Sequence, residues 1–322
     1  MKKIFFLLIS IIILSCSRED NPLNNTSTVE GTILRSYKQG SSTSQGEHFF
    51  ENNGTRYEKI VRADGTTYIK YIYDSNNRMT KIIVAPDDTS YNDKTLFYYD
   101  NAGKITKMEK DRRFLGTTGE LKTWLFTYSG NVVTQEFVSD EDPNYNHKRI
   151  RYTFNNEGFL VSYHDYNDSP NNTYVSTSLY MTFRYDNNKN MISLKRTDGG
   201  THDLPDSPTN NVITNIISYE YDDKLNPLHL VYKNNYMNYI FSNNYPFNLE
   251  RSSFQDRVVG TGRNNLKRTI YQIDPISGGL PIDNDYKNEY TYQTNNLPKR
   301  MGRVSITDNR EYSYITFNYI TE

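Results

Sequence analysis

Residues 97–108 read FYYDNAGKITKM, and this short stretch decides the fold. Its aromatic residues at positions i and i+2 share one face, as alternate residues of a β-strand do. Asp, Asn and Gly follow, and tight chain reversals favour these residues, glycine because it accepts a positive φ. An apolar segment then returns. The stretch therefore predicts one β-hairpin, with an aromatic strand followed by an apolar strand.

The same hairpin unit recurs along most of the chain. The clearest copies are residues 71–83, 97–108 and 183–194, and weaker copies begin at Phe126, Tyr152, Tyr219, Tyr239 and Tyr290. A unit of this size cannot bury its apolar face alone, so neighbouring units must stack to form one core. The repeat predicts an all-β antiparallel meander of hairpins, either a strongly curved open sheet or a closed, barrel-like shell.

The composition agrees with a β-rich chain. Among the 322 residues, 29 are tyrosines, and aromatic side chains pack well on a pleated sheet. The formal net charge is −1, so no basic excess exists that would attract nucleic acid, and we expect no nucleic-acid partner. The chain has a single cysteine, Cys16, which excludes an internal disulfide.

The N-terminal segment has the features of an export signal. A basic start at residues 1–3 precedes an apolar run at residues 4–14, and Ser15 then stands directly before Cys16. The run is shorter than the roughly 20 residues that a membrane-spanning helix needs, which favours a cleaved signal peptide over residues 1–15. The segment resembles a bacterial lipoprotein lipobox. This resemblance implies that Cys16 becomes the acylated N-terminus of the mature protein.

The residues after Cys16 carry a second resemblance. Ser17, Arg18, Glu19 and Asp20 are similar to the surface-export signal of Bacteroidetes lipoproteins, in which acidic residues follow the cysteine. We expect a lipidated flexible tether over residues 16–30 and one folded domain over residues 31–322. The expected partner is the membrane, reached through the lipid. The expected location is the outer membrane, at the cell surface or otherwise on the periplasmic face.

The hairpin unit also resembles a known repeat. Over about residues 55–320 it is similar to the YD repeat of Rhs-like proteins, with the pattern aromatic-x-Tyr-Asp-x-x-Gly-Arg-Leu. It also resembles a porin-like-fold domain of unknown function found in Bacteroidetes lipoproteins. The chain departs from the pattern where Ser129, Asn155 and Ser242 replace the aspartate. The resemblance implies a curved antiparallel sheet and no particular reaction.

Charged residues argue against a barrel embedded in lipid. Such a barrel needs an apolar side chain at every second position of its strands. In this chain the positions expected to face outward are occupied by Lys70, Lys81, Lys107, Arg184 and Lys195. We therefore expect a barrel or sheet surrounded by water, which the lipid tether would hold at the membrane.

The sequence shows few signs of catalytic chemistry. It has no HExxH, no GxSxG and no cysteine pair, and no cofactor is expected. Asp198, His202, Asp203 and Asp206 form a weak candidate for an oxygen-ligated cation, although a solvated loop is the favoured interpretation. Paired carboxylates that meet in space, as in glycoside hydrolases, stay open as an alternative.

These observations favour a binding or scaffold module without catalysis. Its ligand would be a glycan, a peptide or an envelope partner. An extracellular polymer hydrolase and a purely structural envelope component are the alternatives. Trp124 and the tyrosine rows suggest ligand stacking, but packing between repeats is the favoured interpretation. We expect a ligand site to use the longer connections, which are residues 110–122, 139–148, 164–178, 197–215 and 273–288.

Overall fold

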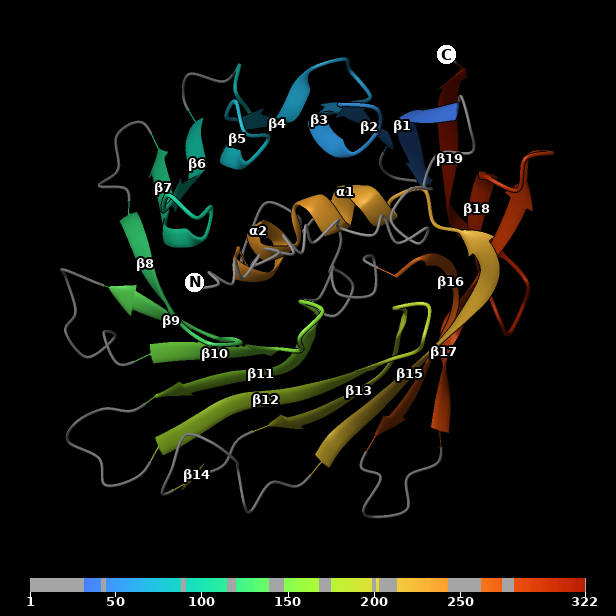
Figure 1. The fold of residues 1–322 in the computed structure, drawn as a ribbon. Helices are drawn as coiled ribbons and strands as arrows, with labels where there is room; N and C mark the ends of the chain where they lie inside the picture. Colours follow the sequence, from blue (N-terminus) through green and yellow to red (C-terminus); the bar gives the residue numbers. More distant parts are fainter. Residues whose placement is uncertain are drawn as a thin grey trace, which may run out of the picture.

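A computed structural model shows a sheet that closes on itself around a lumen (Figure 1). The structure describes residues 32–41, 45–87, 91–114, 120–138, 148–167, 175–198, 201–202, 213–242, 262–273 and 281–321. The strands are β1 (Thr32–Ser41), β2 (Gln45–Glu51), β3 (Arg56–Arg62), β4 (Thr67–Tyr73), β5 (Met79–Val84), β6 (Tyr91–Tyr99), β7 (Ile105–Phe114), β8 (Glu120–Ser129), β9 (Val132–Val138), β10 (Lys148–Phe154), β11 (Leu160–Asn167), β12 (Val175–Tyr185), β13 (Met191–Asp198), β14 (Thr201–His202), β15 (Ile213–Leu225), β16 (Asn264–Ile273), β17 (Pro281–Tyr292), β18 (Pro298–Ser305) and β19 (Glu311–Thr321). The helices are α1 (His229–Asn234) and α2 (Tyr236–Phe241).

Every long strand pairs antiparallel with its neighbours in the chain, and β1 pairs with β19 to close the ring. The sheet has nineteen strands, and β14 is a two-residue strand beside the end of β12, which leaves eighteen in the ring. The predicted all-β meander of hairpins is confirmed, and of its two forms the closed one is present. Closure removes the unpaired edges that an open sheet would expose.

An aspartate or asparagine side chain shapes most of the short turns. In the turn at residues 74–78, Asp74 Oδ1 accepts hydrogen bonds from the backbone N–H groups of Asn76 and Arg78, both at 2.9 Å. Asn155 makes the equivalent bonds to Glu157 and Phe159 at 3.0 and 2.9 Å. An asparagine oxygen thus replaces the aspartate without loss of the turn. The fourth residue of the turn has a positive φ in five copies, at Asn77, Gly103, Gly158, Lys189 and Asn296.

Because the sheet is a meander, the turns alternate between the two ends of the barrel. The short turns of the repeat, among them residues 52–55, 74–78, 100–104, 130–131 and 155–159, all lie at one end, which we call the turn rim. The second aromatic residue of each unit stands just before its turn, so these aromatic residues form a row beneath this rim.

Tyrosine hydroxyls link several repeats to the preceding one. Tyr99 Oη donates to the carbonyl of Met79 at 2.6 Å, and Tyr128 Oη donates to the carbonyl of Ile105 at 2.9 Å. The same bond recurs, at 2.7 to 3.0 Å, from Tyr185, Tyr221, Tyr290 and Tyr319. Burial raises the pKa of Tyr99 to about 12, so its hydroxyl keeps the proton that it donates. The expectation that these tyrosines pack between repeats is confirmed.

The two short helices fill the lumen near the turn rim (Figure 1). All residues from Asn238 to Phe241 are buried, and the ring of Phe241 stacks on Phe126 at 4.5 Å. The unit predicted at Tyr239 is therefore wrong, since these residues form α2 instead of a hairpin. At six residues α2 makes fewer than two turns, so its sequence is too short to reveal a 3.6-residue period.

The outward positions of the strands carry many charges. Lys70, Arg184 and Lys195 are exposed, as expected from the sequence. Ion pairs join charges on neighbouring strands, for example Arg149 on β10 with Glu136 on β9 at 3.3 Å. Within the part of the chain that the structure describes, no helix is long and apolar enough to cross a membrane.

A buried histidine predicts a pH-dependent stability. His48 is 7% exposed and its Nδ1 lies 3.0 Å from the hydroxyl of Tyr37. Burial lowers the pKa of His48 from 6.5 to about 3, so the unfolded chain binds a proton that the folded protein excludes. We expect the free energy of unfolding to fall as the pH drops from 6.5 towards 3. Urea unfolding at a series of pH values measures this slope.

A His48→Gln variant tests the assignment of this slope to His48. Glutamine can accept the Tyr37 hydroxyl and does not titrate, so the variant should lose up to about 1.4 kcal/mol per pH unit of the slope. An equal slope in His48→Gln and the wild type would show that other groups cause the dependence.

Candidate binding cavity

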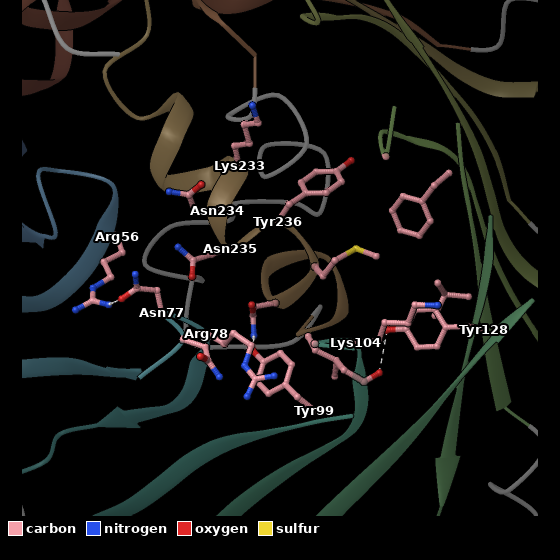
Figure 2. Close-up of a pocket in the computed structure, with 18 of the residues that line it drawn as sticks. Arg56, Asn77, Arg78, Tyr99, Lys104, Tyr128, Lys233, Asn234, Asn235 and Tyr236 are labelled. Atoms are coloured by element: carbon pink, nitrogen blue, oxygen red, sulfur yellow. Dashed lines mark hydrogen bonds between the residues drawn. The ribbon is translucent and has the colours of Figure 1, made fainter. Parts of the chain in front are cut away.

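A cavity of about 700 Å³ opens at the turn rim (Figure 2). Its outer wall is made by successive turns of the barrel, from Asn52 to Gly158, and its inner wall by residues 233–238 at the junction of α1 and α2. Asn76 and Asn156 on the turns are exposed, whereas Asn235 and Asn238 on the helical side are buried. The cavity therefore leads from solvent at the rim to the base of the helical plug.

Two arginines of the outer wall are held in place by carboxylates and tyrosine rings. Arg78 contacts Asp74 Oδ2 through Nε and Nη2, both at 2.7 Å, and lies 4.7 Å from the centre of the Tyr99 ring. Arg56 pairs with Glu51 at 3.0 Å. These contacts orient both guanidinium groups before any ligand arrives, so binding would cost little side-chain entropy.

Hydrogen bonds fasten the helical wall to the barrel. Asn238 Nδ2 donates to the hydroxyl of Tyr99 at 2.8 Å. The hydroxyl of Tyr236 accepts from the backbone N–H of Leu160 at 3.0 Å. Both contacts join residues far apart in sequence, and each side chain also lines the cavity. The position of the plug thus sets the shape of the cavity.

Amide side chains dominate the lining. Nine asparagines contribute to it, together with three tyrosines and four basic residues. Asn131 Nδ2 donates to Asn156 Oδ1 at 2.9 Å, which leaves the Asn156 amide N–H groups for other partners. An amide offers both donors and acceptors in a plane, and a hydroxyl-rich ligand needs this combination.

The cavity is basic. Arg56, Arg78, Lys104 and Lys233 line it, and among the described residues that form its walls there is no aspartate, glutamate or histidine. Searching the described residues finds no group of three or more His, Cys, Asp or Glu side chains placed to hold a metal ion. The arrangement is suited to holding polar or anionic groups.

The residues singled out in the sequence have different outcomes. Cys16 and residues 17–20 lie outside the described residues, as do Asp203 and Asp206 of the weak cation candidate. Asp198 ends β13 and His202 lies in β14, but their side chains are also outside the described part.

The inner, helical wall of the cavity was not predicted from the sequence. A ligand site was expected in the longer connections, and the strand ends that these connections join lie at the opposite end of the barrel from the turn rim. The run Asn234-Asn235-Tyr236-Met237-Asn238 supplies part of the cavity wall. Its high asparagine content was the available signal, and the sequence analysis assigned no role to this run. Tyr99 and Tyr128 combine the expected packing role with a place in the cavity wall.

The fold and the cavity define a closed antiparallel β-barrel with a helical plug and a basic cavity at one rim. No protein-family model matches the sequence, and no curated protein matches it. A solved porin-like protein from Bacteroides vulgatus is similar over 89% of this chain and 98% of its own, at 10% identity and a TM-score of 0.38. A porin-like protein from Bacteroides uniformis is similar over 79% and 95%, at 12% identity and a TM-score of 0.22.

A third similarity is to a larger assembly. The Tc holotoxin pore of Photorhabdus luminescens aligns with 84% of this chain but only 14% of that chain, at 12% identity and a TM-score of 0.25. The expected resemblance to a porin-like domain thus has a counterpart among solved structures, at the level of overall architecture.

Proposed function

We propose that this protein is a lipid-anchored binding module of the cell envelope that captures a glycan in the cavity at the turn rim. The observation that supports this most is the lining of the cavity, in which nine asparagines, three tyrosines and four basic residues stand beside apolar side chains. Sugars present paired hydroxyl groups, and planar amides and guanidinium groups can bind both members of such a pair.

The closed barrel favours a glycan over a peptide. Extended peptides commonly bind by adding a strand to an exposed sheet edge. Here β1 and β19 pair along most of their length, from Thr32 with Thr321 to Ser41 with Ser313. The ring therefore offers no long free edge. A helical peptide would need an apolar groove, whereas the described lining of this cavity combines apolar groups with nine asparagines and four basic residues.

The alternatives receive less support from this cavity. A hydrolase of extracellular polymers would use two carboxylates about 5 to 9 Å apart. The described cavity walls carry no carboxylate. A purely structural envelope component needs no polar cavity, whereas this chain builds one from several separate turns and a plug.

The location rests on the N-terminal sequence and on the outer face of the barrel. Residues 1–15 have the pattern of a lipoprotein signal and place Cys16 at the acylation position, with Ser17–Asp20 as the proposed export signal. Charges such as Lys70, Arg184 and Lys195 on the outer face favour a barrel surrounded by water. The proposed location is the outer membrane, with the barrel on the cell surface.

The test is a binding screen of the mature chain against a panel of neutral and acidic polysaccharides. An Asn76→Trp variant should weaken binding at least tenfold, because Asn76 lies on the cavity wall and the larger ring would obstruct the opening. Isothermal titration calorimetry measures the affinity of each variant for every polysaccharide that binds the wild type.

Ser75→Trp is the matched control, since Ser75 is the neighbouring exposed turn residue and does not line the cavity. It should bind as the wild type does. Equal binding by Asn76→Trp and Ser75→Trp would place the site elsewhere. The absence of any binding polysaccharide would overturn the glycan assignment.

A further inference from the structure

Three basic residues form a row along the outer wall of the cavity. Each follows its turn at the same position, four residues after Asn52, Asp74 or Asp100. Each also lies over the second tyrosine of the next repeat. The pairs are Arg56 over Tyr73 at 4.5 Å, Arg78 over Tyr99 at 4.7 Å and Lys104 over Tyr128 at 5.0 Å.

The geometry of the sheet sets the spacing of this row. Neighbouring strands lie about 4.8 Å apart, so positions one hairpin apart are separated by about 10 Å along the rim. Arg56, Arg78 and Lys104 occupy three consecutive hairpins, and all three line the cavity. The row therefore presents positive groups at a regular interval along one wall.

Packing between repeats does not require a cation at this position. In the turn at residues 155–159 the equivalent residue is Phe159, and its ring packs on Tyr185 at 5.2 Å. The equivalent residue after Asp186 is Asn190, which bonds to Asp186 instead. In these two repeats an apolar or a neutral side chain thus occupies the position of the cation. The three cations, in contrast, follow consecutive turns that line the cavity.

Two members of the row keep donors available for a ligand. Arg78 uses Nε and Nη2 on Asp74, and its Nη1 lies beside Gly103 with no hydrogen-bond partner among the described residues. Lys104 has its ring contact with Tyr128, and no carboxylate of the described chain lies within ion-pair distance of it. A ligand carboxylate could accept hydrogen bonds from both Arg78 and Lys104. Such charge-assisted hydrogen bonds are stronger than those between neutral groups.

We propose that the ligand is a linear acidic polysaccharide, held with its carboxylates along the row Arg56, Arg78 and Lys104. This inference rests on the proposed function and names the class of glycan. A disaccharide of an extended polysaccharide is comparable in length to the spacing of the row, so in a polymer with a carboxylate on every sugar, alternate carboxylates would each meet one cation per hairpin. The hydroxyl groups between them face the asparagines.

A nucleic acid is the other extended polyanion, and the cavity is less suited to it. Binding of single strands relies on open aromatic faces on which bases stack. In this cavity Tyr99 and Tyr128 each have a face covered by a cation, and the hydroxyl of Tyr99 is engaged by Met79 and Asn238. The formal net charge of the whole chain is −1, so long-range attraction of nucleic acid is also weak.

The experiment compares polygalacturonate with the same polymer after its carboxyl groups have been reduced to alcohols. The mature protein should bind the acidic form at least tenfold more tightly, and added salt should weaken this binding. Lys104→Gln should reduce the affinity for the acidic form about tenfold, the usual size of one charge-assisted contact. Lys104→Arg should restore binding. Lys299→Gln, the same change at an exposed lysine outside the cavity, should have no effect.

Each contrary outcome has a separate meaning. Equal binding of the acidic and the reduced polymer would overturn the acidic class and leave the glycan function standing. Equal affinities of Lys104→Gln and Lys299→Gln, with both variants folded by thermal unfolding, would overturn the role of the row. Tighter binding of a single-stranded DNA oligonucleotide would also overturn the inference. If neither polymer nor any neutral glycan binds, the proposed function itself is wrong.

Discussion

Replacing Phe241 by alanine should lower the free energy of unfolding by about 3–5 kcal/mol, the usual cost of emptying a buried aromatic site. Phe241 is fully buried, and its ring lies 4.5 Å from that of Phe126 and 5.1 Å from that of Tyr152. The Gln135 side chain also donates to the carbonyl of Phe241 at 3.4 Å. Strands β8 and β10 therefore pack against the C-terminal end of α2. Urea unfolding followed by circular dichroism measures the change.

Tyr312→Ala is the control for this loss. Tyr312 is 48% exposed on β19, so its truncation should cost less than about 1 kcal/mol. Phe241→Leu, which keeps most of the volume, should lie between the two variants. A cost below about 1 kcal/mol for Phe241→Ala would mean that α2 does not pack inside the barrel in solution. The inner wall of the proposed cavity would then be absent as well.

A Cys16→Ala variant should move the protein from the membrane fraction to the soluble fraction. The proposed anchor is the acyl chains on Cys16, and each buried CH₂ of such a chain contributes about 0.8 kcal/mol to membrane binding. The outer face of the described barrel carries exposed charges such as Lys70, so it should not hold the protein in lipid by itself. Cell fractionation with a high-salt wash measures the distribution.

Ser17→Ala is the control for anchoring, because it leaves the cysteine in place and should stay with the membrane. Retention of Cys16→Ala through the high-salt wash would contradict the lipid anchor. Protease treatment of intact cells then distinguishes the two faces of the outer membrane for the wild type. Degradation without permeabilisation would agree with a surface location, and survival until the outer membrane is opened would favour the periplasmic face.

The hairpin architecture was predictable because its determinants are local. An aromatic pair at i and i+2 needs only strand geometry, and Asp100 with Gly103 needs only the bonding pattern and positive φ of one turn. The hydrogen bonds that tyrosine hydroxyls make between repeats were harder to predict from the sequence. The repeated position of Tyr99 and Tyr128 indicated packing, but nothing in the sequence identified the carbonyls of Met79 and Ile105 as their acceptors.

The helical plug could not be predicted by the same reasoning. Residues 236–241 lie within a segment that satisfies both the aromatic-x-aromatic pattern and the polar turn pattern. A strand would need a neighbour for its backbone groups, whereas a helix satisfies them internally. Six residues make fewer than two helical turns, so no amphipathic period can be recognised in the sequence of α2.

The cavity forms only when the sheet closes, because its lining residues come from several separate turns and from the helices inside the ring. Arg56, Arg78 and Lys104 were visible only as basic residues after turns, because the sequence does not state which turns share a wall. Lys233 and Asn238 come from a segment distant in sequence and form the inner wall of the same cavity from within the lumen.

By itself, the amino-acid sequence determined the repeated hairpins, the polar turns, the charged outward positions and the export pattern before Cys16, since each depends on residues within a few positions of one another. Only the tertiary structure decided the pairing of β1 with β19, the entry of α1 and α2 into the lumen and the meeting of the cations with the asparagines. These features depend on contacts between residues far apart in the chain. Their free energy comes from burial and ring closure, which a local pattern does not record.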